Sequence, residues 1–96
     1  MKLSAFKASL ARDKPPQGLS QALEALWWDA KGDWDKADGL AQKAGGAGAW
    51  VHAYLHRKEG DLGNARYWYR QSGRKLATDT PFEAEWEEIA RTLLAE

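Results

Sequence analysis

Two histidines are the residues whose type and spacing could most directly support chemistry. His52 and His56 are four residues apart in the stretch AWVHAYLHRKEG (49–60), so on a helix both imidazole rings lie on one face. Such a pair can supply two metal ligands, but no glutamate stands between them as in zinc proteases, and the sequence does not identify a third ligand. The favoured interpretation is a partly buried pair of satisfied histidines. A metal-binding or enzymatic protein that uses His52 and His56 is the alternative.

Aromatic and basic residues near the histidines suggest a contact surface. Tyr67, Trp68 and Tyr69 are consecutive, so on a helix they point in three directions and cannot all face one core. We expect Tyr69 in the core, Trp68 against the last helix and Tyr67 exposed or in a groove. Packing of all three rings between helices is the alternative. Because tyrosine, tryptophan and arginine dominate binding hot spots, we predict a contact set of six residues. These are Trp28, His52, His56, Arg57, Tyr67 and Arg70.

Charge is balanced overall but uneven along the chain. Fourteen basic residues match fourteen acidic ones, which argues against a nucleic-acid partner. Six basic residues lie between Arg57 and Lys75, and six acidic residues follow from Asp79 onward. One interpretation places the acidic last helix beside the basic fifth helix. The alternative is a basic groove for an acidic peptide or a phosphate-bearing ligand, in which Arg57 and Arg70 hold carboxylates.

Several classes of protein have no support in the sequence. The absence of cysteine excludes disulfides, thiol catalysis and cysteine-ligated zinc. There is no glycine-rich phosphate loop and no nucleophile elbow, so we predict no cofactor and no enzyme activity, although the histidines could meet Asp29 or Asp33 in space. No apolar run approaches the ~20 residues of a membrane span, and the N-terminus lacks the apolar core of a signal peptide. A cytoplasmic protein without a membrane partner is the expectation.

The apolar periodicity predicts the elements that position these residues. Six helices are expected at about 2–12, 19–30, 34–44, 49–59, 62–72 and 81–95. The fourth is apolar on nearly all sides, which favours a central position. Gly32–Asp33 and Gly60–Asp61 each supply a helix stop followed by an N-cap. Thr80 is expected to cap the last helix, with Pro81 at its first position and Glu83 completing a capping box, and 45–48 is expected to be a flexible connection.

An internal repeat relates the two middle pairs of helices. Gly32-Asp33-Trp34-Asp35-Lys36-Ala37 aligns with Gly60-Asp61-Leu62-Gly63-Asn64-Ala65 at an offset of 28 residues. With Ala25 and Trp28 upstream and Ala44 downstream, this pattern resembles the tetratricopeptide repeat family. The period is shorter than the family's 34 residues, and a glycine run replaces the proline between repeats. The chain also resembles a group of small bacterial proteins of unassigned function, which implies no activity.

The resemblance covers about residues 20–73 and implies antiparallel helical hairpins arranged as an α–α superhelix. The length of the chain fits one domain, so we expect a single all-α domain over residues 1–96. Its repeat units would cover about 20–46 and 49–73, and its capping helices about 2–12 and 81–95. The preferred function is a non-enzymatic protein–protein interaction module that binds a peptide or acidic segment through an aromatic and arginine surface. A self-associating structural protein, hence a homo-oligomer, is a further alternative.

Overall fold

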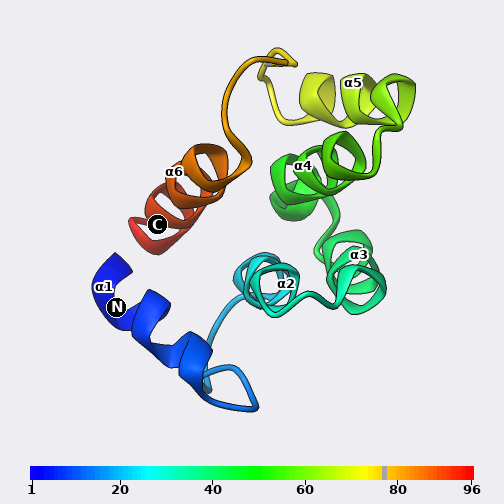
Figure 1. Cartoon of the computed structure of the whole chain (residues 1–96). Coiled ribbons are helices and arrows are strands. Elements are labelled where there is room, and N and C mark those ends of the chain that lie inside the picture. The colour runs from blue at the N-terminus through cyan, green and yellow to red at the C-terminus, as the bar shows by residue number, and fades with distance from the viewer. Residues whose placement is uncertain (77) are drawn as a thin grey trace.

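The computed structural model describes residues 1–76 and 78–96 and is all-α over that range (Figure 1). The predicted all-α class is therefore confirmed. The elements in chain order are α1 (Leu3–Ala8), the 3₁₀ turn η1 (Ser9–Ala11), α2 (Gln21–Ala30), α3 (Trp34–Lys43), the 3₁₀ turn η2 (Gly45–Gly48), α4 (Ala49–Glu59), α5 (Leu62–Gln71) and α6 (Phe82–Leu94).

Two helical hairpins form most of the molecule. α2 packs along α3, and α4 packs along α5, as the sequence repeat predicts. α6 lies against α1, α2 and α4, so that it covers the side of the hairpins opposite to α3 and α5 (Figure 1). The helices therefore enclose one core, to which α1, α2, α3, α4, α5 and α6 all contribute.

α4 is the central helix. Every residue from Ala49 to Arg57 is buried, and the helix packs against α2, α3, α5 and α6. The sequence predicts this position because apolar side chains cover most of the circumference of the helix. Consequently a polar side chain between Ala49 and Arg57 has little access to bulk water and must find partners inside the protein.

The two Gly-Asp turns have the predicted chemistry. Gly60 ends α4 with a φ of 87°, and Gly32, which follows α2, has a φ of 86°. That left-handed conformation is open to glycine without a steric penalty. The side chains of Asp33 and Asp61 then accept hydrogen bonds from the amides of Lys36 and Asn64, and so cap α3 and α5.

The predicted cap of the last helix is wrong. α6 begins at Phe82, its N-cap residue is Pro81, and no side chain of the described residues caps it. Thr80 instead contacts α4 through its main chain, since its carbonyl oxygen accepts a hydrogen bond from Nη1 of Arg57 at 3.1 Å. The segment before α6 is thus held by a tertiary contact that a local capping pattern does not reveal.

The predicted flexible connection between the hairpins is also wrong. Residues 45–48 form the 3₁₀ turn η2, and Gly48 is buried. A Cβ atom at Gly48 would lie 2.5 Å from the carbonyl oxygen of Ala41 and 2.8 Å from Cβ of Ala44. Glycine is therefore required there by close packing of η2 on the end of α3, rather than by a need for flexibility.

Indole N–H groups connect helices across the core. The Nε1 atom of Trp34 on α3 donates to the carbonyl oxygen of Leu55 on α4 at 3.0 Å. Trp86 on α6 donates likewise to the carbonyl of Leu26 on α2 at 3.0 Å. Two further indoles bond to polar side chains, Trp27 to Ser9 and Trp50 to Glu85. These buried and half-buried indoles thus have their N–H groups satisfied, as removal of a donor from water requires.

Candidate functional site

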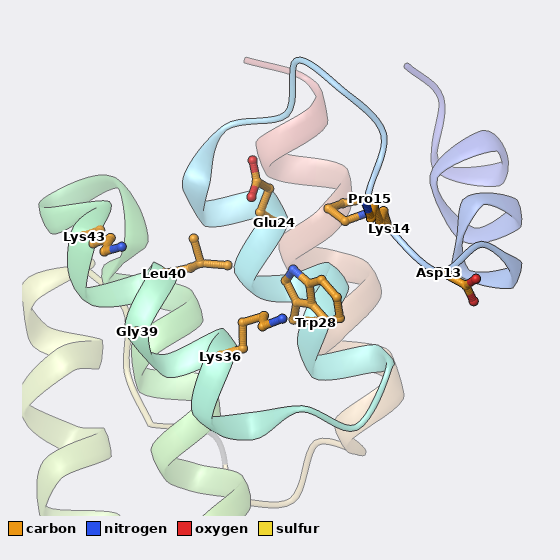
Figure 2. Close-up of a pocket in the computed structure, with 9 residues that line it drawn as sticks. All are labelled: Asp13, Lys14, Pro15, Glu24, Trp28, Lys36, Gly39, Leu40 and Lys43. Atoms are coloured by element: carbon orange, nitrogen blue, oxygen red, sulfur yellow. The ribbon is translucent and has the colours of Figure 1, made fainter.

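The six residues of the predicted contact set lie in separate places. Trp28 lines a hollow of about 710 Å³ between α2, α3 and the segment around Pro15 (Figure 2). The side chain of Lys36 reaches from α3 toward Trp28, and its Nζ lies 4.0 Å from the ring centroid (Figure 2). None of the other five predicted residues lines this hollow. Trp28 is therefore not part of one surface with them.

Arg57 is an internal residue, so its predicted role as an exposed contact for a partner's carboxylate is wrong. It is 7% exposed, its Nε donates to Oε1 of Glu85 at 3.0 Å, and its Nη2 lies 2.8 Å from the same oxygen. Its sequence position could not show this, because Glu85 is 28 residues away on α6. The guanidinium is already occupied by a buried carboxylate.

Glu85 is the centre of a buried polar network. Its Oε2 accepts from Nε1 of Trp50 at 3.1 Å and from the hydroxyl of Tyr69 at 2.6 Å, while Oε1 accepts from Arg57. Burial, together with the adjacent Glu85 carboxylate, raises the pKa of Tyr69 well above its ordinary value. This network joins α4, α5 and α6.

The expected ion pairs between the acidic last helix and the basic fifth helix are therefore wrong, because α6 pairs with other helices. The ion pairs of α6 are those of Glu85 with Arg57 on α4 and of Glu87 with Lys7 on α1. Within the described residues, no carboxylate lies within ion-pair distance of Arg66 or Arg70 on α5. The positive charge of α5 is not neutralised by α6.

Exposed cations gather along α5 and just after it, and we call them the basic face: Arg66, Arg70, Arg74 and Lys75. They line a hollow of about 390 Å³. Arg74 also covers the ring of Trp50, with its Cζ 3.6 Å from the ring centroid. Tyr67, between Arg66 and Arg70 in sequence, is 45% exposed, as predicted. Of the six predicted contact residues, only Tyr67 and Arg70 lie in this area of the surface.

The two histidines are buried, as the favoured interpretation predicts, and carboxylates surround them. Nε2 of His52 lies 3.1 Å from Oδ1 of Asp38 on α3, and Nε2 of His56 lies 3.7 Å from the same oxygen. Nδ1 of His56 is hydrogen-bonded to Oε1 of Glu59 at 2.6 Å. We call Asp38, His52, His56 and Glu59 the histidine cluster. It lies where α3 crosses α4.

Aromatic rings enclose the histidine cluster. Trp68 stacks on His52 with the ring centroids 4.3 Å apart, so the prediction that Trp68 packs on the last helix is wrong. Trp34 presents its edge to His56 at 5.7 Å. Burial lowers the pKa of His52, although the nearby Asp38 carboxylate opposes this shift. The His52 imidazole is therefore disposed to be neutral near pH 7.

Sequence reasoning missed both carboxylates of the histidine cluster. Glu59 follows His56 by three residues, so helical spacing could have identified it. Asp38 follows Trp34 by four residues on α3, but its closeness to α4 depends on the way the hairpins stack. The residues that the sequence offered as partners for the histidines lie elsewhere: Asp29 pairs with Lys58, and Asp33 caps α3.

The donor set of the histidine cluster has a definite chemistry. Two imidazole nitrogens and one carboxylate oxygen, on Asp38, His52 and His56, lie within 4.8 Å of one another. These are ligand types that zinc and related transition metals take in proteins. A second group, His56, Glu59 and Asp61, also has its ligand atoms within 4.8 Å of one another, and in this group Glu59 and Asp61 are exposed.

Over the described residues, no helix combines the length and the apolar character needed to cross a membrane. Comparison of the chain with protein-family models, with curated proteins and with solved structures finds no match. The resemblance to the tetratricopeptide repeat therefore stays a prediction.

Proposed function

We propose that this protein is a non-enzymatic interaction module that binds an acidic peptide segment of a protein partner along the basic face. The observation that carries the proposal is the charge of that face. Its four cations are exposed, line a common hollow, and have no carboxylate of the described chain at ion-pair distance. A surface of one sign attracts and orients a partner of the opposite sign.

The spacing of the cations indicates the shape of the bound segment. Arg66 and Arg70 are one helical turn apart, which places their attachment points roughly 5–6 Å from each other. In an extended peptide, side chains on one side recur about every 6.6 Å. A segment with carboxylates at alternate positions therefore matches these two guanidinium groups. Arginine is suited to such contacts because its planar group can hold a carboxylate in a bidentate manner.

Tyr67 would supply the apolar part of the contact. Its side chain is 45% exposed although its ring also meets Trp68 edge-on at 5.0 Å. A tyrosine fixed by a neighbouring ring loses little conformational entropy on binding and can still bury a large area. The residue of the peptide that reaches Tyr67, on the same side of the strand as the carboxylates, should therefore be apolar. The resemblance to tetratricopeptide repeats supports the same class of function, since that family consists of interaction modules.

The test uses a labelled synthetic peptide with glutamates at two alternate positions and leucine at the next position on the same side, and fluorescence anisotropy as the readout. Wild type is compared with the double variant Arg66→Ala/Arg70→Ala. The matched control is Lys2→Ala/Arg12→Ala, which removes two exposed cations from another part of the surface. If each surface pair contributes ~0.2–1 kcal/mol, the double variant should bind roughly 2- to 30-fold more weakly, and the control should bind as wild type does.

Three results would overturn the proposal. Equal weakening in both double variants would mean that net charge alone determines binding. Equal affinity for a peptide with lysine in place of glutamate would mean that the contact is apolar. A stable dimer in light scattering that dissociates in Tyr67→Ser would assign the surface to self-association instead. Arg57 is not a suitable residue for this test, because its removal would leave Glu85 buried without its counter-charge.

A further inference from the structure

We propose that Asp38, His52 and His56 form a binding site for a divalent transition-metal ion of the zinc type. This site is separate from the basic face. It lies beneath α5, between α3 and α4, and its ligands come from two hairpins rather than one.

The first argument is an unsatisfied acceptor. Oδ1 of Asp38 is buried and, among the described residues, accepts no hydrogen bond. Nε2 of His52 lies 3.1 Å from this oxygen, and it can donate there only when that nitrogen carries the proton. The other oxygen, Oδ2, accepts from Nε2 of Gln42 at 2.8 Å, which fixes the carboxylate with Oδ1 toward the histidines. A buried carboxylate oxygen without a donor is costly unless a cation approaches it.

The second argument concerns the tautomer of His56. Its Nδ1 is 2.6 Å from Oε1 of Glu59, and the carboxylate can only accept there, so Nδ1 carries the proton. In the neutral ring Nε2 then presents a lone pair, and it faces Oδ1 of Asp38 at 3.7 Å. Among residues 1–76 and 78–96, only Nδ2 of Asn64 approaches this nitrogen as a donor, at a long 3.4 Å. Two acceptors that face each other are the arrangement that a metal ion between them would stabilise.

The third argument is distance. Ligand atoms at ~2.1 Å from a zinc ion, with angles of 90–110° between them, are ~3.0–3.4 Å apart. The His52–Asp38 separation of 3.1 Å falls in this range, and the His56–Asp38 separation of 3.7 Å exceeds it by a few tenths of an ångström. The two imidazole rings, with centroids 4.8 Å apart on successive turns of α4, present the same edge to Asp38. A small rotation of side chains would complete the site.

The outer contacts have the pattern found around metal-binding histidines. A ligating histidine commonly donates its other N–H to a carboxylate, which orients the ring and increases the basicity of the ligand. Glu59 occupies that position for His56. Gln42 donates to Oδ2 of Asp38, the oxygen that would not bind the metal. Nitrogen ligands favour zinc, cobalt or nickel over calcium or magnesium, which prefer oxygen. With three protein ligands, one coordination position would remain for water.

The experiment is a titration of the full chain, first freed of metal with a chelator, with zinc chloride. Binding is followed by calorimetry and by tryptophan fluorescence, because Trp68 stacks on His52. We expect one ion per chain, a higher melting temperature with zinc, and no response to magnesium. Cobalt(II) should give visible absorption bands of a nitrogen- and oxygen-ligated ion, which a merely structural role of these residues would not produce.

Variants locate the site. Asp38→Asn and His52→Gln should each lose zinc affinity by 10-fold or more, while Glu59→Gln should lose affinity by ~10–100-fold with the stoichiometry unchanged. Asp35→Asn is the matched control, since it removes an exposed carboxylate from the same helix. Melting curves in chelator establish that each variant folds.

Three outcomes would overturn the inference. The first is a wild-type protein that takes up no zinc at about 100 µM, far above the dissociation constant of a built site. The second is equal affinity in Asp38→Asn and wild type. The third is loss of binding in Asp61→Asn with retention in His52→Gln, which would assign zinc to the exposed group of His56, Glu59 and Asp61.

Discussion

Replacement of Glu85 by alanine is the sharpest test of the network that joins α4, α5 and α6. Glu85 is 4% exposed and accepts hydrogen bonds from Trp50, Arg57 and Tyr69. The change removes all three acceptor contacts at once. It also leaves the guanidinium of Arg57, itself buried, without its carboxylate.

The expected cost follows from this geometry. Removing one partner of a buried ion pair destabilises a protein by ~3–5 kcal/mol, because the remaining charge stays buried without compensation. The total stability of a domain of this size is ~5–14 kcal/mol. The variant should therefore lose a large fraction of its free energy of unfolding and melt roughly 12–40 °C lower, at ~4–8 °C per kcal/mol.

Urea denaturation followed by tryptophan fluorescence measures this cost. Glu88→Ala is the matched control, since it removes an exposed carboxylate from the same helix. The double variant Arg57→Met/Glu85→Leu separates loss of charge pairing from loss of packing. Because it buries no unpaired charge, it should recover at least half of the stability that Glu85→Ala loses.

A cost of less than about 1 kcal/mol for Glu85→Ala, similar to that of an exposed pair, would refute the reasoning. It would mean that Arg57 and Tyr69 find water or other partners when Glu85 is absent. A double variant as unstable as the single one would show that shape, rather than charge, determines the cost.

Three further predictions concern local features of the chain. Gly48→Ala should cost ~1–3 kcal/mol because its Cβ would overlap the end of α3, whereas Gly46→Ala, where a Cβ meets nothing within 4 Å, should be tolerated; thermal melting compares the two. Asp33→Ala should cost ~1 kcal/mol through loss of the α3 cap, whereas Thr80→Ala should cost little, since Thr80 does not cap α6; equal costs would contradict the assignment of caps. The third prediction concerns alkaline pH. The pKa of Tyr69 is raised in the folded state, so above pH ~10 the unfolded chain binds fewer protons than the folded one, and the free energy of unfolding should fall as pH rises. Urea denaturation between pH 9 and 11 should show a smaller fall in Tyr69→Phe than in wild type, and identical slopes would contradict this origin.

The sequence predicts the helices well because their signals are local. Apolar periodicity locates all six, and the Gly-Asp pairs define the turns at Gly32 and Gly60. The central position of α4 also follows from its own residues, since no other arrangement buries so many apolar side chains on all sides of one helix. The wrong cap at Thr80 has a different origin, because Arg57 determines the main-chain contact there from a distance.

The sites were harder to predict because they depend on contacts between helices. Arg57 and Arg70 have the same chemistry in the sequence, yet one is buried on Glu85 and the other is exposed. Only the docking of α6 distinguishes them. Asp38 is likewise one of several carboxylates on helical surfaces, and the crossing of α3 over α4 selects it as the neighbour of the histidines.

The indoles that bridge helices also make individual helix contacts separately observable. Trp34 bridges α3 and α4, Trp50 bridges α4 and α6, and Trp86 bridges α6 and α2, each through one N–H proton. Such a proton exchanges with deuterium only when its own contact opens, so its rate measures the free energy of that opening. If α6 detaches before the hairpins separate, the protons of Trp50 and Trp86 will exchange together and ahead of that of Trp34. Three side chains of one type would thus report the order in which the molecule comes apart.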